Sequence, residues 1–442
     1  MSLRVYYQRF VVGELLSEPG QGARFRYAPD WLATRGAFPV STAIPLTDRI
    51  YEAERVEPWF ANLLPEEANL RAVLRALGAA EGDLQTILQA IGGDTAGALS
   101  FGVPNDPADH RYLPLVDYYR ERRGQTFAGV AEAFAFHINE LGARPFMIDD
   151  DGVRTSLAGG QEKTVLATLE NGRPVLGVGV DCRDRLAVPM AGAPSTVIVK
   201  PDNPHLPGIV ENEAYCLELA RRIGLPAVEW AIIAGAEGRS ALAVARYDRR
   251  ESTRGLTRVH QEDFAQALGV PPRQKYERAT GGGPSLLDIL SVGQRLSLAR
   301  DRLTLLDYVI YNILVANTDA HAKNYSLLIE SGGEVRLAPL YDVTCVLPWA
   351  DVPVNQYHAQ NLGGRKRRPH DMQKRYWEDL AVAAGFNPRE TVRRVRDLAD
   401  AMVGQQMAAK QAVAAWPHVN AAALDTVADA VDKTVRRVGG RL

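Results

Sequence analysis

The chain has only three cysteines among 442 residues, Cys182, Cys216 and Cys345, and no two of them form a C-x-x-C pair. This sparse, odd count argues against a disulfide framework and a cysteine-based zinc site, and it suits a reducing compartment. No window approaches 18 uninterrupted apolar residues, so no transmembrane helix is expected. The N-terminus lacks the basic and apolar regions of a signal peptide. These absences predict a cytoplasmic protein that does not enter membranes.

An excess of positive charge is also missing. The sequence holds 51 Lys and Arg against 53 Asp and Glu, a net charge of −2. Without a positive field, direct nonspecific binding to nucleic acid or to an anionic membrane is not expected. Hydrophobic residues make up 46% and charged residues 24%, which is typical of a globular protein. The length predicts two or three domains.

The pattern of strands and helices changes along the chain. Residues 1–145 mix short strands with helices, residues 146–250 are rich in predicted strands with one helix, and residues 251–442 are mostly helical. This order predicts an α+β fold of the bilobal, protein-kinase-like kind. A β-rich nucleotide lobe and a helical catalytic lobe would follow an added N-terminal α/β domain.

The most informative stretch follows a predicted helix and contains Asp319 and, five residues later, Asn324. Two predicted strands, Tyr325–Ile329 and Val335–Leu340, then flank a Gly-Gly turn and lead to Asp342. This is the layout of a protein-kinase catalytic loop and the metal-binding aspartate that follows it. Asp and Asn also fill ordinary turns, and that alternative applies to either residue alone.

Phosphoryl transfer explains why these residue types recur in this order. The protein must position groups and neutralise charge, with little covalent chemistry of its own. Asp319 is therefore the candidate base that accepts the proton of the attacking hydroxyl. Asn324 and Asp342 are candidate ligands of Mg²⁺, because a hard cation prefers oxygen. His321, inside the same loop, is interpreted as hydrogen-bonded scaffolding.

A candidate phosphate loop lies earlier, where a strand, a small-residue loop and a second strand are predicted over Thr155–Leu169. Backbone N–H groups of such a loop can approach phosphate oxygens where glycine leaves room. The loop is not a Walker A motif, because Glu162 stands where glycine is required before Lys-Thr. An ordinary hairpin turn fits this sequence as well. The candidate ATP-binding residues of the loop are Gly159, Gly160, Gln161, Glu162 and Lys163.

Lys200 ends the β-branched run that begins at Val197 and can bridge the α- and β-phosphates of ATP. A solvated charge at a strand end is the alternative. The next helix offers Glu211 and Glu213 as partners that would orient this lysine. A further predicted strand, Ala241–Tyr247, precedes the helical part, where a hinge would present backbone groups to adenine.

With these motifs in place, the sequence resembles the HipA-type serine/threonine kinases of bacterial toxin–antitoxin modules. The resemblance covers nearly the whole chain. FRYAPDWLATRGAFPVS and FANLLPE match the family's N-terminal domain. Its kinase core is matched by SLAGGQEKT, VKP around Lys200, NEAYCLELARRIGL, ALAVARYDRR, QEDFAQALG, NTDAHAKNYS and LAPLYDV.

The resemblance implies roles at the matching positions. Asp319 would be the catalytic aspartate, Asn324 and Asp342 would hold Mg²⁺, and Lys200 would bind the phosphates of ATP. Ala245 and Tyr247 would lie in the hinge that binds adenine.

Ser156 falls on the family's autophosphorylated serine, whose modification displaces the phosphate loop and inactivates the kinase. A phosphate there would add about −1.5 to −2 charges where the phosphates of ATP must sit. Two regions depart from the family pattern. Ala245 stands where glutamate is frequent, and residues 349–368 diverge, so substrate choice is expected to differ.

The resemblance also implies partners. A small helix-turn-helix antitoxin would neutralise the toxin, and operator DNA would be bound indirectly through that antitoxin, which suits the near-neutral charge. The protein substrate would be a translation component such as an aminoacyl-tRNA synthetase. Two other functions stay open: a non-catalytic module that binds antitoxin and operator, and a small-molecule kinase. The basic run Arg365–Arg368 is a solvated loop or a phosphate contact.

Overall fold

The computed structural model describes residues 2–18, 22–142, 144, 147, 150, 152–235, 238–252, 255–277, 282–349 and 356–442. The chain divides into two compact units, each assembled from separate segments. The first unit comprises residues 1–201, 233–272 and 328–334, and the second comprises residues 202–232, 273–327 and 335–442. The predicted boundaries near residues 145 and 250 stay a prediction.

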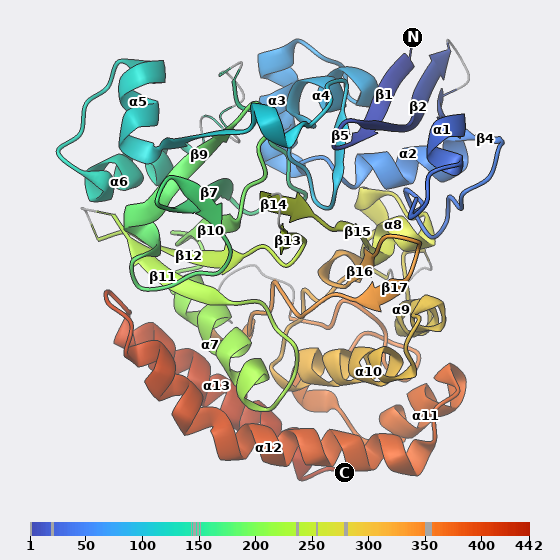
Figure 1. Cartoon of the computed structure of the whole chain (residues 1–442). Coiled ribbons are helices and arrows are strands. Elements are labelled where there is room, and N and C mark those ends of the chain that lie inside the picture. The colour runs from blue at the N-terminus through green and yellow to red at the C-terminus, as the bar shows by residue number, and fades with distance from the viewer. Residues whose placement is uncertain are drawn as a thin grey trace. The chain divides into compact units, whose positions relative to one another are not determined.

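The first unit begins with an antiparallel five-stranded sheet in the order β4-β3-β2-β1-β5 (Figure 1). Short helices lie between its strands in sequence and pack on the sheet. The elements are β1 (Ser2–Tyr7), β2 (Phe10–Glu18), β3 (Gly22–Tyr27), α1 (Pro29–Leu32), β4 (Ile50–Tyr51), α2 (Ala53–Ala61), α3 (Glu67–Leu77), α4 (Leu84–Ile91) and β5 (Leu99–Phe101).

Alternation along the strands explains the core of this sheet. In β1, Leu3 and Val5 are buried while Ser2 and Arg4 are exposed, the period of two that a half-buried strand requires. Aromatic rings from separate elements meet beneath the sheet, where Phe60 of α2 lies 6.0 Å from the ring of Phe25 and 5.9 Å from that of Phe101.

The first unit also holds most of a second sheet, while residues 230–232 of its strand β11 belong to the second unit. The strand order of this sheet is β11-β12-β10-β7-β9-β6, with β8 paired to β7. Its printed neighbours are antiparallel. Two helices, α5 and α6, pack beside β9 and against each other (Figure 1). The elements are β6 (Arg111–Pro114), α5 (Leu115–Arg123), α6 (Val130–Glu140), β7 (Thr164–Glu170), β8 (Arg173–Val175), β9 (Leu186–Met190), β10 (Val197–Pro201), β11 (Trp230–Ala234) and β12 (Ser240–Ala245).

Short elements after β12 complete the first unit: β13 (Arg249–Ser252), β14 (Gly255–Arg258), β15 (His260–Asp263) and α8 (Phe264–Leu268). Glu262 at the end of β15 binds the N-terminal segment, since its carboxylate accepts hydrogen bonds from the hydroxyls of Ser41 and Thr42 at 2.5 and 2.6 Å. This buried carboxylate joins parts of the chain that are about 220 residues apart.

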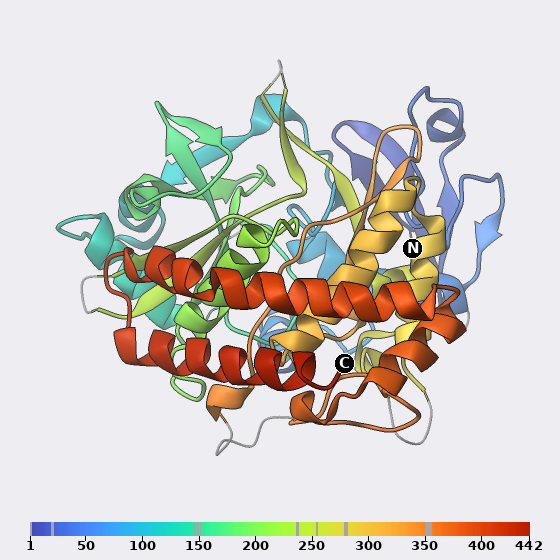
Figure 2. The ribbon, with the colours of Figure 1, turned by 90° about the horizontal axis from the view of Figure 1, so that it is seen from below.

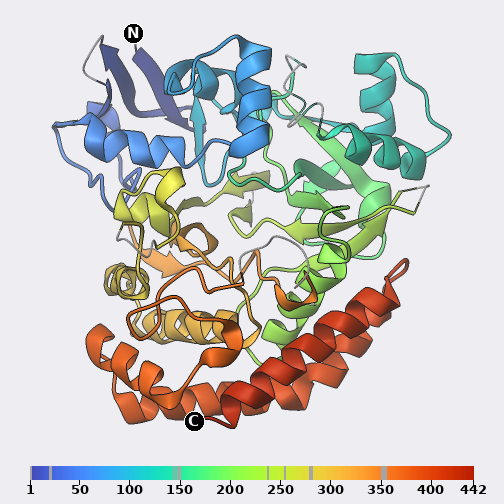
Figure 3. The same ribbon diagram turned by 180° about the vertical axis from the view of Figure 1, so that it is seen from behind.

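The second unit is mainly helical, with α12 (Pro388–Ala414) and α13 (Ala421–Gly439) side by side (Figure 2). They run antiparallel, because Lys410 near the end of α12 pairs with Asp425 near the start of α13 at 2.8 Å. The helix α7 (Ile209–Arg222) packs on both, as Figure 3 shows from behind. The other elements are α9 (Leu286–Val292), α10 (Ala299–Leu314), β16 (Ser326–Ile329), β17 (Val335–Leu337) and α11 (Lys374–Ala384).

Several predicted elements are confirmed within a few residues, among them the helix α7, the strands β7 and β10, and the hairpin of β16 and β17. The strand predicted before the small-residue loop is wrong. Only Thr155 makes an isolated bridge there, to Asp94. The segment finds its backbone partner in one residue of the N-terminal region rather than in a neighbouring strand.

Candidate active site

The loop that carries Asp319 begins where α10 stops. The helix ends at Leu314, and Ala316 then takes a left-handed conformation with φ of +60°. The carbonyl of Ala316 accepts the N–H of Val346 at 3.1 Å, and the side chain of Asn317 donates to Asn312 Oδ1 on α10 at 2.8 Å. The loop is therefore fixed at its start both by the helix and by the chain that follows Asp342.

Asn324 brings the predicted catalytic residues together within the second unit. Its amide Nδ2 donates to the carbonyl of Asp319 at 3.2 Å and to the carbonyl of Asp342 at 3.3 Å. The other amide atom, Oδ1, is buried and has no hydrogen-bond partner among the residues that the structure describes. Because both bonds occupy the nitrogen, the amide is oriented with its oxygen available to a cation.

Asp342 itself adopts a conformation that is uncommon for a residue with a side chain, with φ of +58°. Such positions cost about 1–3 kcal/mol and concentrate at functional sites. The donor set of Asn324 and Asp342 consists of oxygen atoms, which fits Mg²⁺. No group of three or more His, Cys, Asp or Glu side chains disposed to hold a metal occurs in the described ranges. Mg²⁺ often takes only one or two protein ligands and completes its shell with water and phosphate.

Asp319 is exposed at this loop, and a residue that the sequence analysis missed contacts it. The hydroxyl of Tyr276 donates a hydrogen bond to Asp319 Oδ1. The ring of Tyr276 also meets the ring of His321 edge to face, with centroids 4.9 Å apart. Tyr276 stood in no motif and lies 43 residues before Asp319, so spacing offered no signal.

His321 is buried within the loop, but its imidazole Nδ1 has no hydrogen-bond partner among the described residues, so its role as hydrogen-bonded scaffolding stays a prediction. Burial, and after it the nearby Lys275 ammonium, lower the pKa of His321 well below its ordinary value. The imidazole is therefore neutral at physiological pH. Its backbone N–H donates to the carbonyl of Asp319 at 2.7 Å.

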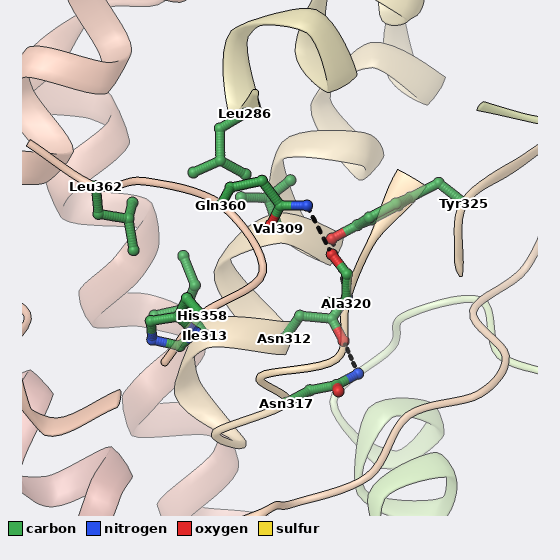
Figure 4. A pocket seen from close by; sticks show the side chains of 10 residues that line it. All are labelled: Leu286, Val309, Asn312, Ile313, Asn317, Ala320, Tyr325, His358, Gln360 and Leu362. Atoms are coloured by element: carbon green, nitrogen blue, oxygen red, sulfur yellow. Dashed lines mark hydrogen bonds between the residues drawn. The ribbon is translucent and has the colours of Figure 1, made fainter. Parts of the chain in front are cut away.

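The opposite side of the loop is supported by residues 358–362 (Figure 4). The side chain of Gln360 donates to the carbonyl of Ala320 at 3.0 Å, which holds the loop from behind. A small pocket between these residues and the loop has room for about one water molecule, so it is too small for a substrate. It is lined by Leu286, Val309, Asn312, Ile313, Asn317, Ala320, Tyr325, His358, Gln360 and Leu362.

The candidate ATP-binding lysine lies in the first unit. Lys200 is buried on β10, opposite Leu242 of β12, so its ammonium is not a solvated charge at a sheet edge. Its predicted partners Glu211 and Glu213 lie on α7 in the second unit. There the carboxylate of Glu211 accepts the backbone N–H of Asn420 at 2.9 Å, and burial raises the pKa of Glu211.

The candidate phosphate loop also lies in the first unit, before β7. Gly159 has φ of +104°, a backbone conformation that side-chain-bearing residues rarely adopt, and this favours glycine here. The ammonium of Lys163 donates to the carbonyl of Ala158. Glu162 pairs with Arg239 at 3.4 Å, while Gly160 and Gln161 are exposed and half-buried.

Ser156, just before this loop, is fully buried. Its hydroxyl donates to the carbonyl of Leu63 at 2.9 Å, and its N–H donates to the carbonyl of Asp94 at 3.0 Å. Both partners belong to the N-terminal region. In the described structure, the serine predicted to be autophosphorylated therefore binds its segment to the N-terminal region through two hydrogen bonds.

The predicted hinge residues are Ala245, at the end of β12, and Tyr247, two residues later. Ala245 pairs with Val197 of β10, and the hydroxyl of Tyr247 donates to the side chain of Gln261. Between them, the side chain of Arg246 points into a buried ion cluster, where it binds Asp248 at 2.7 Å. The backbone of the hinge is therefore anchored on both sides.

That cluster, which we call the Asp94 network, was not predicted. Asp94 Oδ1 binds Arg249 at 2.7 Å and Arg258 at 2.9 Å, and its other oxygen accepts the Ser195 hydroxyl at 2.6 Å. Burial would raise the pKa of Asp94, but Arg249, Arg258 and Arg246 outweigh it and hold the pKa below its ordinary value. The run RYDRR was a visible signal, yet nothing in it indicated burial.

Part of the basic run Arg365–Arg368 has a structural role. Lys366 donates to the carbonyl of His358 at 3.1 Å, and the guanidinium of Arg367 lies 3.7 Å from the centre of the Tyr376 ring. Arg365 and Arg368 are exposed. In the segment 349–368, whose divergence from the family stays a prediction, residues 350–355 lie outside the described residues.

Comparison with family models gives two matches. The model of the HipA N-terminal domain matches residues 3–102, and the model of the HipA-like C-terminal domain matches residues 155–406. The second match covers more than half of the chain and includes every candidate site residue.

Two relatives and one solved structure extend these matches. The chain is 34% identical to "Putative kinase Y4mE" of Sinorhizobium fredii, over 90% of this chain and 89% of that protein. It is 30% identical to "Serine/threonine-protein kinase toxin HipA" of Shewanella oneidensis, over 79% of this chain and 76% of the relative. The solved complex of Shewanella oneidensis HipA with HipB and operator DNA superposes with a TM-score of 0.79 and 24% identity, covering 99% of this chain and 97% of that one. This likeness confirms the predicted α+β, kinase-like fold with an added N-terminal domain.

Proposed function

This chain belongs to the HipA family, and from that premise we propose that it is an ATP- and Mg²⁺-dependent serine/threonine protein kinase that acts as the toxin of a toxin–antitoxin module. One observation carries the catalytic part of the proposal. Asn324 binds the backbone of both Asp319 and Asp342, and its buried Oδ1 is left without a partner among the described residues. That is the arrangement a phosphoryl-transfer site needs.

Each residue has a distinct task in this mechanism. Asp319 accepts the proton of the attacking serine or threonine hydroxyl and orients that hydroxyl. Asn324 Oδ1 and the Asp342 carboxylate would hold Mg²⁺, and Lys200 with the loop of residues 159–163 would bind the phosphates of ATP. Bound Mg²⁺ would neutralise charge on the phosphate oxygens. The backbone of Ala245 and Tyr247 would bind adenine.

Radiolabel transfer tests the proposed activity. The purified full-length chain is incubated with [γ-³²P]ATP, Mg²⁺ and a panel of purified aminoacyl-tRNA synthetases with their tRNAs. We expect Asp319→Ala to lose at least about 100-fold of the labelling, because it removes the general base. Asp425→Ala removes an exposed carboxylate of α13 and serves as the matched control. Equal labelling by the chain and Asp319→Ala would contradict the catalytic assignment, and labelling by neither would contradict the kinase activity.

Autophosphorylation at Ser156 is part of the proposal. A phosphate on this fully buried hydroxyl would add about −1.5 to −2 charges where the hydroxyl contacts the Leu63 carbonyl. The segment would therefore have to leave its place and take the phosphate loop with it. Mass spectrometry after incubation with ATP should find phosphate at Ser156, and the modified protein should become sensitive to proteases at residues 158–163. Phosphate found only elsewhere would contradict this part.

The partner side of the proposal rests on family membership and on the charge of the chain. With a net charge of −2, the chain should bind operator DNA only through a small helix-turn-helix antitoxin. A mobility-shift assay compares the chain alone, the antitoxin encoded beside it, and the two together. We expect no shift with the chain alone and a larger complex with both proteins. A shift by the chain alone would contradict indirect binding.

A further inference from the structure

The hydroxyl of Tyr276 donates a hydrogen bond to Asp319 Oδ1, a contact that the proposed reaction does not use. In the proposed reaction, a substrate hydroxyl must donate to this same carboxylate before its proton can be transferred. The phenol of Tyr276 offers the same donor group. It therefore occupies, within the chain's own second unit, a place that the acceptor hydroxyl needs.

The residues on both sides of Tyr276 are held by hydrogen bonds. The carbonyl of Lys275 accepts the N–H of Ala322 in the catalytic loop at 3.3 Å. The carboxylate of Glu277 accepts the backbone N–H of Asn361 at 2.6 Å and its side-chain amide at 2.7 Å. Three consecutive residues thus form a strap that we define as Lys275–Glu277. Its contact with Asp319 is built into the fold rather than being a chance approach of a flexible side chain.

Asn361, the residue that binds Glu277 of the strap, lies next to a second residue that contacts the catalytic loop. Asn361 follows Gln360, whose side chain supports the catalytic loop through the carbonyl of Ala320. Both residues lie in the segment 349–368, which the sequence predicts to depart from the family pattern. The segment therefore contacts the catalytic loop directly through Gln360 and indirectly through the strap.

We propose that Tyr276 masks Asp319, its hydroxyl standing in for the acceptor hydroxyl until a substrate displaces it. This rests on the proposed kinase function and adds to it a rule for acceptors. A productive acceptor must compete with an internal hydrogen bond to a charged group. Water alone competes poorly, which limits wasteful hydrolysis of ATP.

Tyr276→Phe removes one oxygen atom and keeps the ring that packs on His321. Hydrolysis of ATP by the full-length chain with Mg²⁺ and no protein acceptor is the readout, since water is then the acceptor. We expect kcat to rise about tenfold with KM for ATP unchanged. Tenfold corresponds to about 1.4 kcal/mol, the low end for a hydrogen bond to a charged group.

Three further variants make the result specific. Tyr357→Phe removes the hydroxyl of an exposed tyrosine in the same unit and should leave hydrolysis unchanged. Asn361→Ala frees the Glu277 anchor and should raise kcat less than Tyr276→Phe does. Tyr276→Phe combined with Asp319→Ala should be as inactive as Asp319→Ala, because the gain acts through this carboxylate.

Other outcomes separate this proposal from its premise. An unchanged or lower kcat in Tyr276→Phe, with an active parent protein, would overturn masking and leave the kinase proposal standing. A lower kcat would mean that the phenol positions Asp319 for catalysis. No Mg²⁺-dependent turnover by the parent protein would overturn the kinase proposal and masking with it.

Discussion

Asn324 illustrates how much chemistry one side chain can carry. The amide nitrogen of Asn324 donates to the carbonyls of Asp319 and Asp342, so a flip that exchanged the amide nitrogen and oxygen would lose both hydrogen bonds. A buried amide oxygen without a partner costs about 1–3 kcal/mol. A cation would compensate this cost, and that is the physical argument for the proposed metal site.

Asn324→Ala should therefore raise the Mg²⁺ concentration needed for half-maximal activity by about tenfold or more, since even indirect supports of metal sites change affinity by 10–100-fold. Titration of ATP-dependent turnover with Mg²⁺ measures the effect. Asn387→Ala removes the asparagine that caps α12 and is the matched control, with an unchanged requirement. A parallel loss in both variants would point to stability rather than to metal binding.

Between elements, the Asp94 network joins the N-terminal region to the strands around the hinge. Asp94 follows α4, Ser195 precedes β10, and the arginines lie near the end of β12 and on β13 and β14. Such buried charges are tolerated because every oxygen of Asp94 is hydrogen-bonded. The same network holds Arg246 at the predicted hinge, so the N-terminal region contributes to the shape of the nucleotide lobe.

Asp94→Ala should lower the free energy of unfolding by about 3–5 kcal/mol, because it leaves the buried charges of Arg249 and Arg258 without their carboxylate. Chemical denaturation of the full-length chain measures this change. Arg250→Ala is the control. Arg250 pairs with Glu330 at 2.6 Å, but its side chain is 58% exposed, and such pairs contribute about 0–1 kcal/mol. Equal losses in the two variants would contradict the stabilising role of the network.

The free energy of unfolding of the whole molecule should depend on pH because several of its histidines are buried. Burial lowers the pKa of His137, His260 and His358 to about 4, well below the ordinary value of 6.5. Below pH 6.5 the unfolded chain therefore binds more protons than the folded one. The stability that these neutral imidazoles contribute is complete above pH 6.5 and is lost as the pH falls towards 4.

The expected slope is about 1.4 kcal/mol per pH unit for each histidine. Thermal unfolding between pH 7 and pH 5 should show a steep fall in Tm, and His137→Gln should flatten it. Tyr119→Phe is the control. It removes the hydroxyl that bonds His137 Nδ1 at 2.9 Å but keeps the imidazole, so it should lower Tm with the pH slope retained. A His137→Gln slope equal to that of the parent would contradict this account.

No helix in the described ranges is long and apolar enough to cross a membrane.

Much of the fold and part of the candidate site could be read from the amino-acid order. Asp319 and Asn324 are five residues apart, and a short hairpin of β16 and β17 leads from Asn324 to Asp342. Short spacing and turn residues are local features, so they predict the loop and the hairpin without knowledge of the rest of the fold. The strand predicted at Thr155 failed for the opposite reason, because its pairing partner is Asp94, far away in sequence.

Patterns in the sequence were thus sufficient for the family and the fold class, and they named a candidate catalytic set that stays a prediction. They could not place Ser156 against Leu63, Tyr276 against Asp319 or Asp94 among three arginines. These contacts join residues separated by 43 to 164 positions. Burial gives energetic weight to those of Ser156 and Asp94, whereas Asp319 is exposed. Only the folded chain brings the members of each pair together, so only the tertiary structure could show the hydrogen bond of Ser156, the proposed masking by Tyr276 and the burial of the arginines around Asp94.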